Sequence, residues 1–209
     1  NNSLVLSANR PVNKVTVWAQ RDDGREAFNH EQVFPSPKPG TPLKIEWPET
    51  DGRLLKIEVK AYDAAGFFVG VNLFPWQINI PHEEVLFETG KWDIRATEQS
   101  KLSKSLDLIL DAVRKYGSFA EVKLYVAGHT DTVGDNASNQ VLSQNRARAI
   151  AGYFKKMGLG IPVFYDGLGE TALAVQTQDE TAEEKNRRAE YVISIEPPKL
   201  GPAHAWKKL

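Results

Sequence analysis

The sequence contains no cysteine among its 209 residues. This absence excludes disulfide bonds, a thiol nucleophile and a thiolate metal site, and it says little about the compartment. No apolar run is long enough to cross a bilayer as a helix. The 4 histidines form no H-x-x-x-H or H-E-x-x-H pair, and no G-x-S-x-G elbow occurs. The sequence therefore gives no support to a zinc protease or a serine hydrolase, and it predicts no catalytic residues, metal site or cofactor.

Net charge is also nearly absent. The chain has 26 Lys and Arg against 27 Asp and Glu, so its net charge is −1. No overall field favours nucleic acid or an anionic membrane as a partner. The hydrophobic content of 41% is ordinary for a globular protein with a core, and the length predicts one or two domains. Because the chain opens with Asn1-Asn2-Ser3 and no signal pattern, we expect a mature or trimmed piece of a longer protein.

Residues 1–80 show short β-prone runs separated by turn residues, and no helical period. Ile57, Val59 and Ala61 alternate with charged residues, as in a strand with one buried face. We therefore predict an N-terminal all-β sandwich of Ig-like or fibronectin-like shape over 1–80. The runs expected to form strands are 14–19, 43–47, 54–62, 67–73 and 76–80.

Residues 81–196 alternate between strand and helix patterns. This order predicts an α+β domain in which helices pack on one face of a mixed β-sheet. The remaining residues, 197–209, are rich in proline, and we expect a poorly ordered C-terminal tail. The expected strands are 84–88, 122–127, 163–169 and 189–196, and the expected helices are 100–116 and 138–157.

One stretch of the second domain combines a strand, a polar loop and a helix. Asp131 lies in the loop, and Arg146 lies two turns into the helix, so both side chains could face one cleft. Such a pair could hold a ligand with an ammonium and a carboxylate on one carbon. Asp131 would accept from the ammonium, and the Arg146 guanidinium would bind the carboxylate. The same spacing also fits a structural ion pair or a loop cap.

The residues around this pair follow the pattern T-D-x-x-G-x-x-x-x-N-x-x-L-S-x-x-R. This pattern resembles the signature of the OmpA-like peptidoglycan-binding domain, which also occurs in Pal lipoproteins and flagellar MotB stators. A second block, 186–188 (NRR) before a strand pattern, agrees with this resemblance. A weaker third block, 85–94, resembles the family's opening strand, so the resemblance covers roughly 78–196. The matching positions are Thr130, Asp131, Gly134, Asn139, Leu142, Ser143 and Arg146.

The resemblance implies a non-enzymatic protein of the periplasm or cell envelope, which a segment not present here could associate with the outer membrane. Its ligand would be the diaminopimelate of the peptidoglycan stem peptide. Asp131 would take the ammonium and Arg146 the carboxylate, while strand 85–87 would open the sheet and line one wall of the cleft. Asn139, the loop amides near Thr132, and Arg187 would add further contacts.

One position departs from the family pattern. Many relatives carry Asn or Asp in the first loop where Gly90 stands in this chain. The resemblance therefore implies that Gly90 contributes its backbone N–H to the ligand and no side chain.

Two other functions remain open from the sequence. The chain could be a structural or protein-interaction module whose β-sandwich, residues 1–80, binds an envelope protein. An exposed aromatic patch on that domain would favour this function, whereas an open cleft at Asp131 and Arg146 would favour wall binding. Wall hydrolysis by Asp131 with Glu170 is a more distant alternative, because no spacing rule links the two carboxylates.

Overall fold

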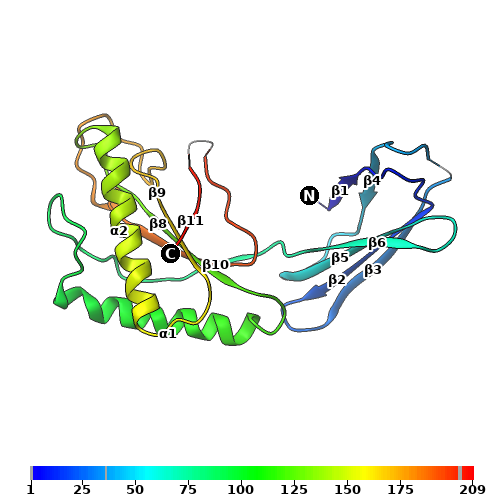
Figure 1. Cartoon of the computed structure of the whole chain (residues 1–209), viewed down its shortest axis with the longest axis horizontal. Coiled ribbons are helices and arrows are strands. Elements are labelled where there is room, and N and C mark those ends of the chain that lie inside the picture. The colour runs from blue at the N-terminus through cyan, green and yellow to red at the C-terminus, as the bar shows by residue number, and fades with distance from the viewer. Residues whose placement is uncertain (1, 36, 202–203) are drawn as a thin grey trace. The chain divides into compact units, whose positions relative to one another are not determined.

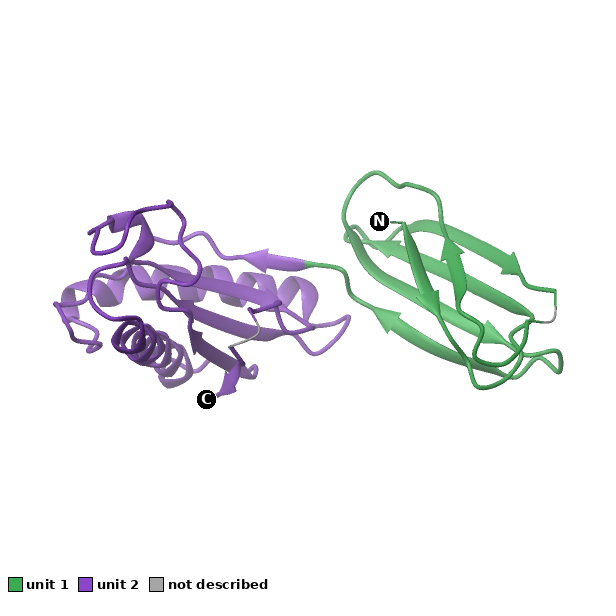
Figure 2. Cartoon of the chain, turned by 90° about the horizontal axis from the view of Figure 1, so that it is seen from above, with its two compact units in different colours: residues 1–76 green, residues 77–209 purple. Residues whose placement is uncertain are grey.

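The computed structural model describes residues 2–35, 37–201 and 204–209. The chain divides into two compact units, Asn1–Trp76 and Gln77–Leu209, which Figure 2 shows in separate colours. This division lies a few residues before the predicted boundary at 80/81. The difference arises because the run at 76–80, expected in the first domain, supplies a strand to the sheet of the second unit.

The first unit is built from two antiparallel sheets. The smaller sheet pairs β1 with β4, and the larger has the order β3-β2-β5-β6. The sequence patterns predicted β2, β4, β5 and β6 but missed β1 and β3, which carry weaker hydrophobic alternation. The strands are β1 (Ser3–Leu6), β2 (Lys14–Arg21), β3 (Glu26–Val33), β4 (Leu43–Glu46), β5 (Leu54–Tyr62) and β6 (Phe68–Leu73).

Alternate residues of the two sheets share one core. Val17 of β2 and Val59 of β5 face the same side and pack in one cluster with Ile45 of β4. The first unit is therefore all-β, as predicted, and its Ig-like or fibronectin-like shape stays a prediction. The small sheet does not extend over β6, since Val69 and Val71 remain 70% and 52% exposed.

The second unit has a five-stranded mixed sheet with the order β11-β9-β8-β10-β7. Figure 1 shows β8, β9, β10 and β11 of this sheet together with α1 and α2. β8 and β9 are parallel, and the other neighbours are antiparallel. The middle three strands and both long helices lie within about two residues of the predicted ranges. The elements are β7 (Gln77–Asn79), α1 (Gln99–Tyr116), β8 (Lys123–Gly128), α2 (Asn136–Lys156), β9 (Val163–Gly167), β10 (Ala189–Ser194) and β11 (Lys207–Lys208).

Both helices pack on one face of this sheet, as predicted. α2 contacts β8 and β9, and α1 contacts α2 and β10. Phe154 of α2 meets the ring of Tyr191 of β10 edge-on, with 5.3 Å between ring centroids. Apolar residues at helical spacing on α1, Leu102, Leu106 and Ile109, are all buried.

The C-terminal residues cover the opposite face, which differs from the poorly ordered tail predicted for 197–209. The Trp206 ring lies 5.0 Å from the Tyr125 ring of β8, and its indole N–H donates to the carbonyl of Pro198. β11 then pairs with β9. The proline content did not predict this packing. It forms because the apolar face of the sheet is removed from water when Trp206 covers it. Residues 202 and 203 of the predicted tail lie outside the described part.

The prediction of a strand at 84–88 was wrong. The strand beside β10 is β7, and the chain leaves the sheet after Ile80, whose N–H donates to the carbonyl of Tyr191. The next residue is Pro81, which has no N–H and cannot extend the ladder. Beyond that point, side chains replace a strand backbone as partners of Ala189 in β10. His82 Nε2 bonds the Ala189 carbonyl, and the Ala189 N–H donates to Glu84 Oε2.

His82 supplies one of these edge contacts. Nδ1 lies 2.7 Å from the carbonyl oxygen of Ile80, and Nε2 lies 2.9 Å from that of Ala189. Both partners are acceptors, so both ring nitrogens must carry a proton, which is the imidazolium form. Burial opposes that charge, but hydrogen bonds to Glu84 and the two carbonyls raise the pKa of His82 above its ordinary value.

This arrangement predicts a pH dependence of stability. Because the folded pKa is raised, His82 stabilises the fold fully below the unfolded value of about 6.5, and this contribution is lost as the pH rises through the folded value. We expect the melting temperature of the wild type to fall more between about pH 6 and pH 9 than that of His82→Gln. His30→Gln, on β3, is the matched control and should follow the wild type; an unchanged slope in His82→Gln would contradict the assignment.

Candidate functional site

The site is positioned by a close approach of α2 to the ends of two parallel strands. A Cβ on Gly128 of β8 would lie less than 3.0 Å from the carbonyl oxygen of Ser143, and one on Gly167 of β9 would meet the Gln144 backbone equally closely. The Ser143 hydroxyl, fully buried, accepts from the N–H of Gly169 at 2.9 Å. The two glycines therefore let the helix backbone contact the strand ends, and the hydrogen bond from Gly169 to Ser143 stabilises this contact.

The loop between β8 and α2 is fixed from several sides. Thr130 N–H donates to the carbonyl of Gly169, and Asp135 caps α2 by accepting from the N–H of Ser138. Gly134 has a φ of +88°, a backbone conformation that favours glycine. These contacts hold the loop residue Asp131 in a defined place at the rim of the sheet.

Asp131 and Arg146 line one cleft of ≈ 570 Å³. The segment 84–90 forms its opposite wall, so the expected contribution of 85–87 to the wall is present even though these residues are not a strand. Among the charged residues that line the cleft are Glu84, Arg95, Asp131, Arg146, Glu184, Arg187 and Arg188.

Asp131 is less open than the sequence suggested. The residue is only 7% exposed, and its Oδ2 accepts from Arg187 Nη1 at 2.6 Å. The Arg187 side chain is 43% exposed, so the pair has one buried anion and one partly hydrated cation. Arg187 therefore keeps the Asp131 carboxylate paired in the empty cleft. Arg187 is also the residue from which the sequence predicted a further cationic contact, and it lines the cleft.

Arg146 is held by the opposite wall. Its Nε donates to the carbonyl of Lys91 at 3.1 Å and its Nη2 to that of Glu88 at 3.4 Å. The guanidinium carbon also lies 5.1 Å from the centre of the Phe87 ring, a cation–π distance. Burial lowers the pKa of Arg146, although the charge of Asp131 opposes this effect. The guanidinium is thus oriented in the cleft while keeping its charge.

The other predicted residues differ in what they can offer. Asn139 lines the cleft but is 5% exposed, and its Nδ2 donates to the carbonyl of Val133 and to Glu170 Oε2. The Thr132 hydroxyl donates to the carbonyl of Gln178 at 2.7 Å, so it braces the loop beyond the cleft. Gly90 lines the cleft in a left-handed conformation, with a φ of +67°.

A buried carboxylate that the sequence analysis missed holds the opposite wall in place. Glu98, 5% exposed at the start of α1, accepts from the N–H of Leu86 and from Lys101 Nζ, both at 2.9 Å. The hydrogen bond from Leu86 and the Lys101 ammonium lower the pKa of Glu98. The i, i+3 spacing of Glu98 and Lys101 at the start of a predicted helix is the sequence signal that could have revealed this anchor.

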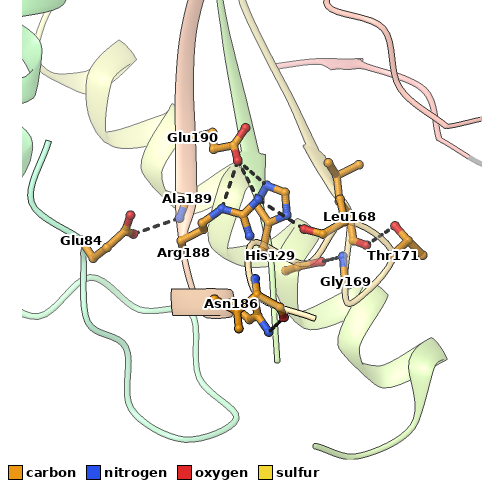
Figure 3. Close-up of polar contacts among 12 residues, drawn as sticks. Glu84, His129, Leu168, Gly169, Thr171, Asn186, Arg188, Ala189 and Glu190 are labelled. Atoms are coloured by element: carbon orange, nitrogen blue, oxygen red, sulfur yellow. Dashed lines mark hydrogen bonds and ion pairs between the residues drawn. The ribbon is translucent and has the colours of Figure 1, made fainter. Parts of the chain in front are cut away.

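His129 lies at the floor of the cleft and is 3% exposed. Figure 3 shows Glu190 between Arg188 and His129, with Oε1 2.7 Å from Arg188 Nη2 and 3.5 Å from His129 Nε2. Burial and the charge of Arg188 lower the pKa of His129 to about 4. The imidazole is therefore neutral at neutral pH and supplies no cation to a ligand.

The arrangement suits binding of a charged ligand better than catalysis. Glu170 is engaged by the amide of Asn139, and Asp131 by Arg187, so the two carboxylates do not form a free acid–base pair. In the described ranges, no three His, Asp or Glu side chains gather where they could hold a metal ion. The described helices are too short or too polar to cross a membrane.

One comparison with known proteins locates a family within the second unit. Residues 86–187 match the model of the OmpA family. The chain is 31% identical over 75 residues to outer-membrane lipoprotein YfiB of Pseudomonas aeruginosa, covering 35% of this chain and 45% of that protein. It is 35% identical over 81 residues to outer membrane protein P5 of Haemophilus influenzae, covering 37% and 20%.

Two further similarities were found, one to a curated protein and one to a solved structure. A match to photosystem I P700 chlorophyll a apoprotein A2 of Gloeobacter violaceus has 28% identity over 121 residues, covering 54% of this chain and 13% of that protein. The chain spans less than half the length of each of these curated relatives. Among solved structures, the peptidoglycan-associated lipoprotein of Burkholderia pseudomallei is 23% identical with a TM-score of 0.43, covering 53% of this chain and 89% of that one.

The tight seat of α2 gives a first test of the site. We expect Gly128→Ala to push α2 from the strand ends and to lower the free energy of unfolding by about 2 kcal/mol or more, as overpacking does. Gly152→Ala, in the same helix with open space around it, is the control and should stabilise by about 0.5–1 kcal/mol. Urea unfolding of both variants checks this; equal stability would contradict the packing argument.

The anchor of the opposite wall gives a second test. Glu98→Ala should cost about 1–3 kcal/mol, because the N–H of Leu86 and the Lys101 ammonium lose a charged partner. Since the folded pKa of Glu98 is lowered, its contribution is complete above the unfolded value and disappears as the pH falls through the folded one. The difference from wild type, measured by urea unfolding, should therefore shrink only below about pH 4.5. The exposed Glu121→Ala is the control, and a difference that persisted at the lowest pH would overturn the assignment.

Proposed function

Because residues 86–187 form an OmpA-family domain, we propose that the chain binds peptidoglycan non-covalently through the cleft of Asp131 and Arg146. The observation that carries this proposal is the placement of a buried carboxylate and an oriented guanidinium in one cleft. A ligand bearing an ammonium and a carboxylate on the same carbon complements both groups. The free end of diaminopimelate in the stem peptide is such a group.

The carboxylate side of this contact uses the guanidinium of Arg146. An arginine has five N–H donors, and backbone carbonyls of Lys91 and Glu88 engage Nε and one N–H of Nη2. The end-on fork of Nη1 and Nη2 is then directed to the ligand carboxylate, which it binds with two parallel hydrogen bonds. Phe87 beneath the guanidinium fixes the plane of this fork.

The ammonium side uses Asp131. Arg187 occupies Oδ2, and a carboxylate has acceptor sites on both oxygens, so Oδ1 takes the ligand ammonium. The N–H of Gly90 and the loop amides near Thr132 add neutral hydrogen bonds. Each charge-assisted bond contributes about 1.5–3 kcal/mol before ordering costs, which gives modest affinity.

The proposed location follows from the proposed ligand. Binding to the wall places the chain in the periplasm or cell envelope, where it would anchor or position a larger protein. The similarity to an outer-membrane lipoprotein and to an outer membrane protein supports this location. Enzymatic turnover of the wall is not part of the proposal, because both candidate carboxylates are engaged by other side chains.

A second role, contact with protein through the first unit, has its own support. An exposed aromatic patch there would favour this role, and Phe67 and Phe68, where β6 begins, are 74% and 57% exposed. This surface is independent of the cleft.

We expect the full chain to co-sediment with diaminopimelate-containing sacculi at micromolar concentration and low salt. Asp131→Ala and Arg146→Ala should each weaken this binding by about 30-fold or more, since an unpaired ligand charge costs about 2–5 kcal/mol. Arg146→Lys should be nearly as damaging, because a single ammonium cannot make the forked contact.

The control for these variants is Arg148→Ala, which removes an exposed arginine from the same helix. It should bind sacculi like the wild type. Thermal unfolding is measured on the same samples, because Arg146 also holds the backbone of 88–91. Loss of stability with unchanged sacculus binding would mean that the pair is structural, and the proposed function would then fail.

A further inference from the structure

β6 is an uncovered edge of the larger sheet in the first unit. Its inner neighbour is β5, and no strand of the described residues pairs with its outer side. Three apolar side chains of the strand are exposed: Phe68 by 57%, Val69 by 70% and Val71 by 52%. Exposed apolar edge strands are sites where another chain can pair.

The two edges of the same sheet are unequally protected. β3, at the other edge, carries the charged residues Glu26 and Glu31, and charge is a common guard against edge pairing. β6 has the sequence FVGVNL, with no charge and no proline. Of the two edge strands of this sheet, β6 is therefore the one better suited to pair with another strand.

The hydrogen bonds of the hairpin show which backbone N–H and C=O groups of β6 face β5 and which face outward. Asp63 N–H donates to the carbonyl of Phe67 in the hairpin that joins β5 and β6, so these two residues form a hydrogen-bonded pair. Hydrogen-bonded and non-bonded pairs alternate along an antiparallel ladder. Val69 and Val71 therefore turn their N–H and C=O groups toward β5, whereas Phe68, Gly70 and Asn72 turn theirs outward.

The sequence Val69-Gly70-Val71 is symmetric about Gly70, so a two-fold axis at Gly70 would set apolar valines opposite each other. We propose that two copies of this chain associate through antiparallel pairing of β6 with β6, with the axis at Gly70. In this register Gly70 faces Gly70, Phe68 faces Asn72, and Val69 faces Val71. All three outward-facing residues of each strand then lie in hydrogen-bonded pairs, and each pair exchanges two bonds.

The same register covers the exposed apolar surface. Val69 and Val71 lie beside Ala61 and Val59 of β5, on the core-facing side that the small sheet leaves open. Pairing places four valines, two from each copy, side by side across the axis and removes apolar area from water. On the other face, the Lys60 side chain of β5 packs against Gly70, where a Cβ would lie 3.2 Å from its Cγ.

The association has a consequence for the wall-binding role, and this step rests on the proposed function. A pair of copies carries two clefts, so binding of one to an immobile polymer raises the effective concentration of the other. Self-association itself does not depend on what the cleft binds.

Sedimentation velocity of the full chain, from about 1 to 300 μM, tests the proposal in the affinity range expected of small interfaces. The wild type should shift from monomer to dimer across this range. Val69→Lys with Val71→Lys sets lysine opposite lysine twice and should weaken dimerisation about tenfold or more. Val69→Lys with Val71→Glu sets lysine opposite glutamate in the same register and should recover much of the loss.

Val33→Lys, at the charged edge of the same sheet and with 68% exposure in the wild type, is the matched control and should leave dimerisation unchanged. Circular dichroism confirms that each variant stays folded. A wild type that remains monomeric throughout would overturn the proposal. A dimer that the double-lysine variant leaves intact, or one that the lysine–glutamate variant fails to recover, would equally overturn the pairing of β6 at Gly70.

Discussion

The backbone of α2 rests directly on the ends of β8 and β9, and the rest of the candidate site depends on this close packing. Gly128 and Gly167 make it possible, since any side chain at either position would collide with the helix. The packing fixes where the loop at 129–135 leaves β8 and where Arg146 emerges from α2. A carboxylate and a guanidinium fifteen positions apart are thereby brought into one cleft.

Asp131 and Arg146 are both held by other groups before any ligand arrives. Asp131 is paired with Arg187, and Arg146 is held by backbone carbonyls and the Phe87 ring. A buried carboxylate without a partner would be costly, so Arg187 stabilises the empty site as well as completing it. A zwitterionic ligand carries one charge of each sign and can meet both Asp131 and Arg146, whereas a simple cation or anion can meet only one of them.

The sequence predicted the parts of this structure that depend on local patterns. Helical spacing located α1 and α2, and the spacing of Asp131 and Arg146 placed them on a loop and a helix that share a cleft. It did not predict contacts between distant segments, such as Trp206 covering Tyr125. It also assigned a strand to 84–88, because β-prone residues there resemble an edge strand, whereas Pro81 ends the ladder and side chains take over.

Calorimetric titration with two soluble stem peptides tests the central claim most directly. One peptide carries diaminopimelate, and the other carries lysine at that position, which keeps the side-chain ammonium but lacks the second carboxylate. Binding through both Asp131 and Arg146 predicts that the lysine peptide binds about 30-fold more weakly or worse, and that Arg146→Ala removes this difference. Equal affinity of the wild type for the two peptides would contradict the account.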